Sequence, residues 1–169
     1  MVEGTYHNSF FVGGGGKQLY STGRGDYGCC GVTLESPTPE FFCSTPARVP
    51  LEYDVKTQGN ISEPTKNCIV EDTIDEDAQP EIEHIAAGSS AHHCMVLCKN
   101  GDVYSWGYGE NGQCGQNRTN DGEDDNDITL PKKMNLEMGK KTKKMRYKVK
   151  YLSGGGQHSA AIITTTDSF

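Results

Sequence analysis

Histidine and cysteine side chains gather in the stretch "HHCMVLC", residues 92–98 of this 169-residue chain. His92, His93, Cys94 and Cys98 are residue types that bind zinc, so a metal site is the first chemistry to weigh. Strand alternation would place His92, Cys94 and Cys98 on one face, but residues four apart on a strand are separated by about 13 Å. One tetrahedral ion does not bridge that distance. We therefore expect His93 to tie a strand to a turn beside buried thiols, with no metal and no cofactor.

Two glycine-rich stretches could cradle a phosphate group, "GGGGKQ" at 13–18 and "GYGENG" at 107–112. Neither ends in the Gly-Lys-Ser/Thr of a P-loop, and no long helical pattern follows either one to direct an N-terminal dipole at the phosphate. The serines of "GSSAHH" and "GQHS" are not part of a Gly-x-Ser-x-Gly elbow before a helix. The sequence therefore favours a non-catalytic protein over an enzyme.

Charge is distributed unevenly along the chain, whose formal net charge is −7. Eight carboxylates in residues 63–83 and five in 121–127 precede a basic stretch, 132–150, that holds nine of the sixteen Lys and Arg residues. The net charge disfavours direct nucleic-acid binding. The basic stretch is typical of a solvated loop, and its alternative roles are binding an acidic partner or acting as a nuclear import signal. The candidates for those two roles are Lys140, Lys141, Lys143, Lys144 and Arg146.

An internal repeat organises the elements around these residues. "LYSTGRGDYGCCG" at 19–31 aligns without a gap on "VYSWGYGENGQCG" at 103–115, with seven of thirteen positions identical. A proline follows each copy, and an apolar run led by a histidine also recurs, at His7, His93 and His158. The other repeat positions are Tyr20, Gly23, Gly25, Gly28 and Gly31 in the first copy, Gly101, Tyr104, Trp106, Gly107, Gly109, Gly112, Gln113, Gly115 and Pro131 in the second, and Gly155 and Ser159 in the third.

Residues 103–106 alternate as a strand does, with Tyr104 and Trp106 on one face and Val103 and Ser105 on the other. The glycines that follow allow the backbone to reverse with positive φ and to approach neighbouring strands closely. The same turn in the first copy contains Arg24-Gly25-Asp26, which we interpret as turn chemistry. The pattern predicts many short strands joined by turns, an all-β fold.

This pattern resembles the repeat of the regulator of chromosome condensation family. The best copy is "HHCMVLCKNGDVYSWGYGENGQCGQ", and the resemblance covers residues 5–50 and 84–165. It implies four-stranded blades of a β-propeller, here a single partial domain of about two blades. The expected parts are a degenerate first repeat region in 1–50, a poorly ordered acidic insertion in 51–83, the best repeat in 84–131, a basic loop in 132–150 and the start of a further repeat in 151–169.

The copies depart from the family pattern at three positions. Thr22 stands where tryptophan is expected, Cys29 replaces the glutamine of "GQxG", and Gly88 lies two residues too far from His93, which leaves Ser90 at the usual glycine position. We therefore expect the first blade to be less well cored than the second.

The resemblance implies a non-catalytic protein–protein interaction module whose partner is a small GTPase or a chromatin protein. The alternative is a guanine nucleotide exchange factor for a small Ran-like GTPase. Two blades do not close a ring, so three possibilities are open: a fragment of a longer propeller, which we favour, a chain that completes a ring by self-association, or a partly ordered remnant. No secretory signal and no run of 18 apolar residues is found, which favours a cytoplasmic or nuclear location and no membrane partner.

Overall fold

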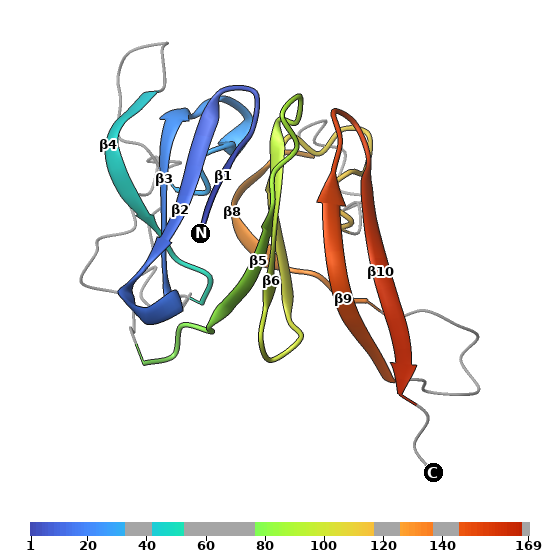
Figure 1. Ribbon diagram of the computed structural model, residues 1–169. Coiled ribbons are helices and arrows are strands. Elements are labelled where there is room, and N and C mark those ends of the chain that lie inside the picture. The colour runs from blue at the N-terminus through green and yellow to red at the C-terminus, as the bar shows by residue number, and fades with distance from the viewer. Residues whose placement is uncertain (33–41, 53–76, 117–125, 137–145, 167–169) are drawn as a thin grey trace, which may run out of the picture.

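A computed structural model describes residues 1–32, 42–52, 77–116, 126–136 and 146–166 (Figure 1). These residues form two four-stranded antiparallel sheets and one two-stranded sheet. The first sheet has the order β1 (Val2–Gly4), β2 (Asn8–Gly13), β3 (Gln18–Arg24), β4 (Phe42–Val49). The second has the order β5 (Ile82–Ala86), β6 (His93–Cys98), β7 (Val103–Gly107), β8 (Ile128–Lys133). The third pairs β9 (Arg146–Gly154) with β10 (Ser159–Thr166). Short 3₁₀ turns η1 (Gly14–Gly16) and η2 (Asp26–Gly28) complete the described elements, so the all-β prediction is confirmed.

The three sheets stand side by side, as blades of a propeller do (Figure 1). Between the first and second sheets lies an apolar core, which we call the first junction, made of Phe10, Leu19, Val49, Leu51, Ile82, Ile85, Cys94, Val96, Cys98, Tyr104 and Trp106. Between the second sheet and the β9–β10 hairpin lies a second junction, made of Ala86, Met95, Leu97, Val103, Val149 and Leu152. Each sheet is therefore stabilised by its neighbours, the arrangement expected of a repeat protein.

Strand β7 contributes to both junctions because all five of its residues are buried. Tyr104 and Trp106 lie in the first junction and Val103 lies in the second. The alternation predicted for residues 103–106 is thus confirmed, and both faces of the second sheet are covered. This accounts for a strand whose side chains are buried on both faces.

The first copy of the repeat uses the same alternation with a different outcome. Leu19 is fully buried in the first junction, whereas Tyr20 and Thr22, on the opposite face of β3, are only half-buried. Tyr20 stacks on Phe11 with ring centroids 5.4 Å apart, and the Arg48 guanidinium lies 5.6 Å from the Tyr20 centroid. Among the described residues no sheet packs on that face, so the position that holds Trp106 in the second copy needs no tryptophan here.

The charged segments predicted from the sequence lie mainly outside the described residues. The acidic insertion proposed for 51–83 is described only at 51–52 and 77–83, and its last residues belong to β5. The basic loop proposed for 132–150 needs correction at both ends. Residues 132–133 finish β8, and residues 146–150 begin β9. In β9, Tyr147 and Val149 alternate with Lys148 and Lys150, as suits a strand with one face in water.

Candidate interaction site

The glycine turn after the third strand of each sheet has the same geometry in both copies. Gly23, Gly28 and Gly31 have φ values of 118°, 70° and 68°, and Gly107, Gly112 and Gly115 have 99°, 76° and 62°. The Ser21 hydroxyl donates to the Cys30 carbonyl at 2.7 Å, and the Ser105 hydroxyl donates to the Cys114 carbonyl at 2.6 Å. The repeat read from the sequence is therefore a repeat in three dimensions, and its glycines hold conformations that other residues rarely adopt.

Each turn reaches across to the neighbouring sheet. In the first junction the Trp106 indole N–H donates to the Cys29 carbonyl at 3.2 Å, and a Cβ on Gly31 would lie 2.7 Å from Trp106 Nε1. The Cys29 thiol donates to the His92 carbonyl at 2.9 Å. Cys29 stands where the family pattern has glutamine, and its thiol adds a second hydrogen bond between the sheets.

In the second junction, His93, Ser159 and Gln113 form a chain of hydrogen bonds. His93 Nε2 lies 2.8 Å from Ser159 Oγ, and Ser159 Oγ donates to the Gln113 carbonyl at 2.7 Å. Since that carbonyl only accepts, the serine proton points at it and the His93 Nε2–H must donate to the serine oxygen. Burial, with smaller contributions from His158 and His92, lowers the pKa of His93 to about 4. The pair therefore joins two sheets and is not arranged as a base and nucleophile.

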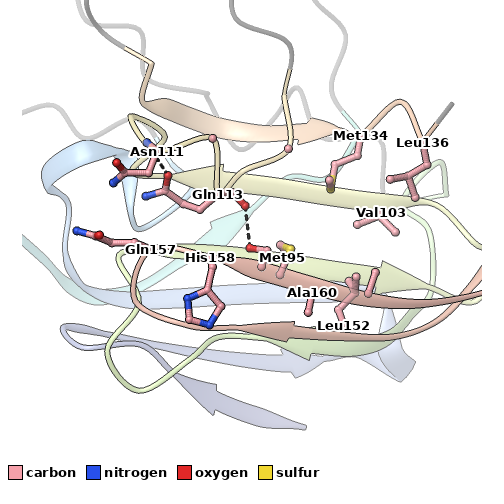
Figure 2. A pocket seen from close by; sticks show the side chains of 14 residues that line it. Met95, Val103, Asn111, Gln113, Met134, Leu136, Leu152, Gln157, His158 and Ala160 are labelled. Atoms are coloured by element: carbon pink, nitrogen blue, oxygen red, sulfur yellow. Dashed lines mark hydrogen bonds between the residues drawn. The ribbon is translucent and has the colours of Figure 1, made fainter. Parts of the chain in front are cut away.

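A hollow of about 350 Å³ lies beside this chain, between the second sheet and the β9–β10 hairpin. Figure 2 shows Met134, Leu136, Val103 and Leu152 at one end and Asn111, Gln157 and His158 at the other. His158 itself is exposed, and a Cβ on Gly155 would meet its ring at 2.3 Å. The hollow therefore continues the apolar second junction toward the outer face of β10.

The cysteines serve as buried apolar groups. Cys29, Cys30, Cys43, Cys94, Cys98 and Cys114 are all free and buried. Burial raises the pKa of Cys29, Cys30, Cys98 and Cys114 to about 12 in each case. Cys94 and Cys98 lie in the first junction, whereas the His93 ring bonds across the second. Within the described residues no group of three or more His, Cys, Asp or Glu could hold a metal ion.

The register corrects the histidine alignment by one residue. Gly23 pairs with Asn8 and Gly107 pairs with His93. The Arg24 amide donates to the His7 carbonyl, just as the Tyr108 amide donates to the His92 carbonyl. His92, rather than His93, therefore occupies the position of His7. The hairpin between β2 and β3 is one residue longer than that between β6 and β7, so no ungapped alignment of the copies shows this.

The corrected position reveals a cluster at the loop end of the first two sheets. A hollow of about 140 Å³ is lined by His7, Asn8, Arg24, Asp26, Tyr27, Cys29 and His92, and we call it the histidine hollow. The His7 and His92 ring centroids are 5.8 Å apart, and Tyr6 packs on both at 4.3 and 5.6 Å. Tyr6 is 62% exposed and Tyr27 is 52% exposed. Burial, followed by His7 and Arg24, lowers the pKa of His92.

The remaining repeat positions predicted from the sequence lie in turns and strands of the sheets. Gly101 has φ 92° in the β6–β7 hairpin, Pro131 is buried in β8, and the Tyr104 hydroxyl donates to Glu52. Gly109 approaches the segment that leads into β8, because a Cβ there would lie 1.9 Å from the Asn126 carbonyl oxygen. Lys140, Lys141, Lys143 and Lys144 lie outside the described residues, and Arg146 is the first residue of β9. No helix in the described part of the chain is long and apolar enough to cross a bilayer.

Comparison with known proteins finds relatives of this chain by sequence. The regulator of chromosome condensation (RCC1) repeat model matches residues 100–162, and a second model of that repeat matches 82–113. The ultraviolet-B receptor UVR8 of Arabidopsis thaliana is 31% identical over 52% of this chain and 17% of its own length. The human E3 ubiquitin-protein ligase HERC2 is 36% identical over 50% of this chain and 2% of its own length. The chain therefore spans a small part of the relatives it matches.

Solved structures agree on the fold. The crystal structure of Kap60 bound to yeast RCC1 (Prp20) matches with a TM-score of 0.64 at 20% identity, over 99% of this chain and 30% of that one. Prp20p from Saccharomyces cerevisiae, described with its binding properties to Gsp1p and histones, matches with a TM-score of 0.62 at 19% identity, over 99% of this chain and 32% of that one. The solved structures and the two four-stranded sheets show that the chain is a partial β-propeller, and the repeat matches show that its residues 82–162 carry repeats of the regulator of chromosome condensation type.

Proposed function

We propose that this chain is a non-catalytic protein–protein interaction module. The observation that carries the proposal is the exposure of Tyr6, Tyr27 and Arg24 together at the loop end of two sheets that the first junction holds rigid. Exposed tyrosine and arginine side chains are enriched where proteins bind one another. Elsewhere the histidine and serine that could form a catalytic pair are used to join sheets.

Site-specific photocrosslinking tests this function. A photoreactive phenylalanine analogue replaces Tyr6 in one variant and Lys99 in another, because Lys99 is also exposed but lies after the opposite end of β6. We expect a discrete protein adduct in cells from the Tyr6 position and none of that mass from the Lys99 position. Equal adducts from both positions, or none from either, would contradict an interaction surface at the loop end.

The basic stretch remains a second proposed contact, for an acidic partner or for import into the nucleus. Reversing the charge of Lys140, Lys141, Lys143 and Lys144 to glutamate should weaken capture of an acidic partner and reduce nuclear accumulation of a fluorescent fusion. The control reverses Lys99, which is exposed and bonded to Glu81. Unchanged capture and unchanged location in the fourfold variant would remove the stretch from both roles.

The alternative function is guanine nucleotide exchange on a small Ran-like GTPase. It is favoured by the likeness to Prp20p, which is described with binding to Gsp1p. Fluorescent GDP loaded on a panel of small GTPases should then leave faster when the chain is added. A flat response across the panel, with a known exchange factor as the positive control, would count against exchange and leave the interaction module standing.

Self-association is proposed as the way in which copies complete the sheets. Among the described residues β10 pairs only with β9, and the hollow beside it exposes part of the second junction. Light scattering together with calorimetry should give a discrete oligomer with a cooperative transition. A monomer or an aggregate without a transition would show instead that further repeats are needed.

A further inference from the structure

The histidine hollow has hydrogen-bond donors that no acceptor in the described part of the chain uses. Arg24 donates through Nε to Asp26, its side chain is 47% exposed, and its two Nη groups donate to no acceptor among the described residues. Neither ring of His7 and His92 makes a hydrogen bond within the described residues. The Asn8 amide is used differently, because it donates to the Arg24 carbonyl at 2.6 Å and so fixes the backbone that carries the guanidinium. Three donor side chains thus surround one small space.

Tyr27 adds an unusual backbone conformation at the rim of this hollow. Its φ is 57°, and among the described residues no other residue except glycine has a positive φ. The equivalent residue of the second copy, Asn111, closes the same turn without positive φ. The turn therefore does not require this conformation, which costs on the order of 1 kcal/mol or more for a residue with a Cβ. Such an outlier beside a hollow is a reason to look for a ligand.

The hollow is preorganised because both sheets contribute to it and are bonded together there. The Tyr6 amide donates to the Ala91 carbonyl at 3.2 Å, and the Cys29 thiol donates to the His92 carbonyl. Tyr27 lines one side of the hollow and packs edge-on against Tyr108, with ring centroids 5.2 Å apart. A ligand entering this space would meet donors already in place, and this lowers the entropic cost of binding.

We infer that the histidine hollow binds a carboxylate side chain from an acidic segment of a partner protein, with Arg24 as the principal donor and with Tyr6 and Tyr27 flanking the segment. The inference rests on the proposed interaction function and names its surface. A guanidinium edge matches the two oxygens of a carboxylate. Asp26 lines the same hollow and pairs with Arg24, so these two side chains together carry no net positive charge that would favour a phosphate dianion over a carboxylate monoanion. The occupant is therefore a single Asp or Glu side chain.

Fluorescence anisotropy tests this inference with the full 169-residue chain. The probe is fluorescein-labelled Gly-Ser-Asp-Leu-Asp-Ser-Gly, and its matched control has Asn in place of both Asp residues. We expect saturable binding of the aspartate peptide alone. Arg24→Gln should weaken it roughly tenfold, as expected for loss of a charge-assisted hydrogen bond. Asp26→Asn should tighten it by about threefold, because a repelling charge is removed.

Two further variants separate binding from folding. Tyr27→Asn copies the residue of the second repeat and should weaken the aspartate peptide while leaving the melting temperature unchanged or higher. Lys99→Gln removes a distant surface cation and should change neither quantity. Equal binding of the Asp and Asn peptides, or equal affinity of Arg24→Gln and the parent chain, would overturn the inference. Tighter binding of a peptide with phosphoserine at one Asp position would overturn it in favour of a phosphorylated partner.

The outcome is distinguishable from failure of the proposed function. If the Tyr6 crosslink forms but the aspartate peptide does not bind, the surface is an interface of other chemistry and only the carboxylate assignment fails. If the crosslink is absent as well, the interaction function fails with it.

Discussion

Trp106 donates its indole N–H to the carbonyl of Cys29, a residue 77 positions earlier, and this bond fixes the glycine turn of the first sheet against the strand β7 of the second. Trp106 is fully buried, and its ring also meets Phe10 edge-on at 5.7 Å. Replacing it therefore removes apolar contacts and leaves a buried carbonyl without its donor.

The first prediction concerns the size of these two effects. Trp106→Phe should lower the free energy of unfolding by about 1 to 3 kcal/mol, mostly through the unpaired carbonyl. Trp106→Ala should lower it by about 3 to 5 kcal/mol, because a cavity is added. Urea unfolding followed by circular dichroism measures both. An unchanged free energy of unfolding in Trp106→Phe would contradict a contribution from the hydrogen bond, and equal losses in the two variants would contradict a separate cost of the cavity.

The second prediction uses one turn position in both repeats. Gly28 and Gly112 have φ values of 70° and 76°, but a Cβ on Gly28 would lie 2.4 Å from Thr129 Cα, whereas one on Gly112 would meet nothing within 4 Å. Gly112→Ala should cost about 1 to 2 kcal/mol of stability through backbone strain alone. Gly28→Ala should cost more, because β8 must move. Identical melting temperatures for the two variants would show that the contact between η2 and β8 carries no stability.

The third prediction is acid sensitivity that depends on His93. Its pKa is about 4 in the folded chain against 6.5 for the free side chain, so between these values the unfolded state binds more protons. Stability should therefore fall as the pH is lowered from about 6.5 to about 4, by a total on the order of 3 kcal/mol from this residue. The melting temperature should change less with pH across that range in His93→Gln than in the parent chain. A parallel pH dependence in both would exclude His93 as the cause.

The fourth prediction concerns the thiols. In a Cys68→Ser variant the six remaining cysteines are all buried, and burial raises the pKa of four of them to about 12. Since the thiolate is the reactive form, these groups should resist a disulfide reagent at pH 8 and react together when the chain unfolds. The control is the same assay in denaturant, which should detect all six. Rapid reaction of several thiols in the native chain would mean that the first junction opens readily.

Local pattern was enough to predict part of this structure. The alternation of Tyr104 and Trp106 with Val103 and Ser105 fixes the faces of a strand, and the spaced glycines fix where the backbone must turn. These are properties of neighbouring residues, so the all-β fold, the blade pattern and the ungapped match between residues 19–31 and 103–115 could be read from the chain itself. The match of the turns in three dimensions confirms them.

What the tertiary structure decided depends on pairing between distant residues. The one-residue difference between two hairpins moves His92, and not His93, into the position of His7, and only strand register shows this. Packing of the first sheet on the second then brings Tyr6, His7, Arg24 and Tyr27 together with His92, from segments more than 60 residues apart. Sequence determined the elements because their rules are local, whereas the histidine hollow exists only where two sheets meet.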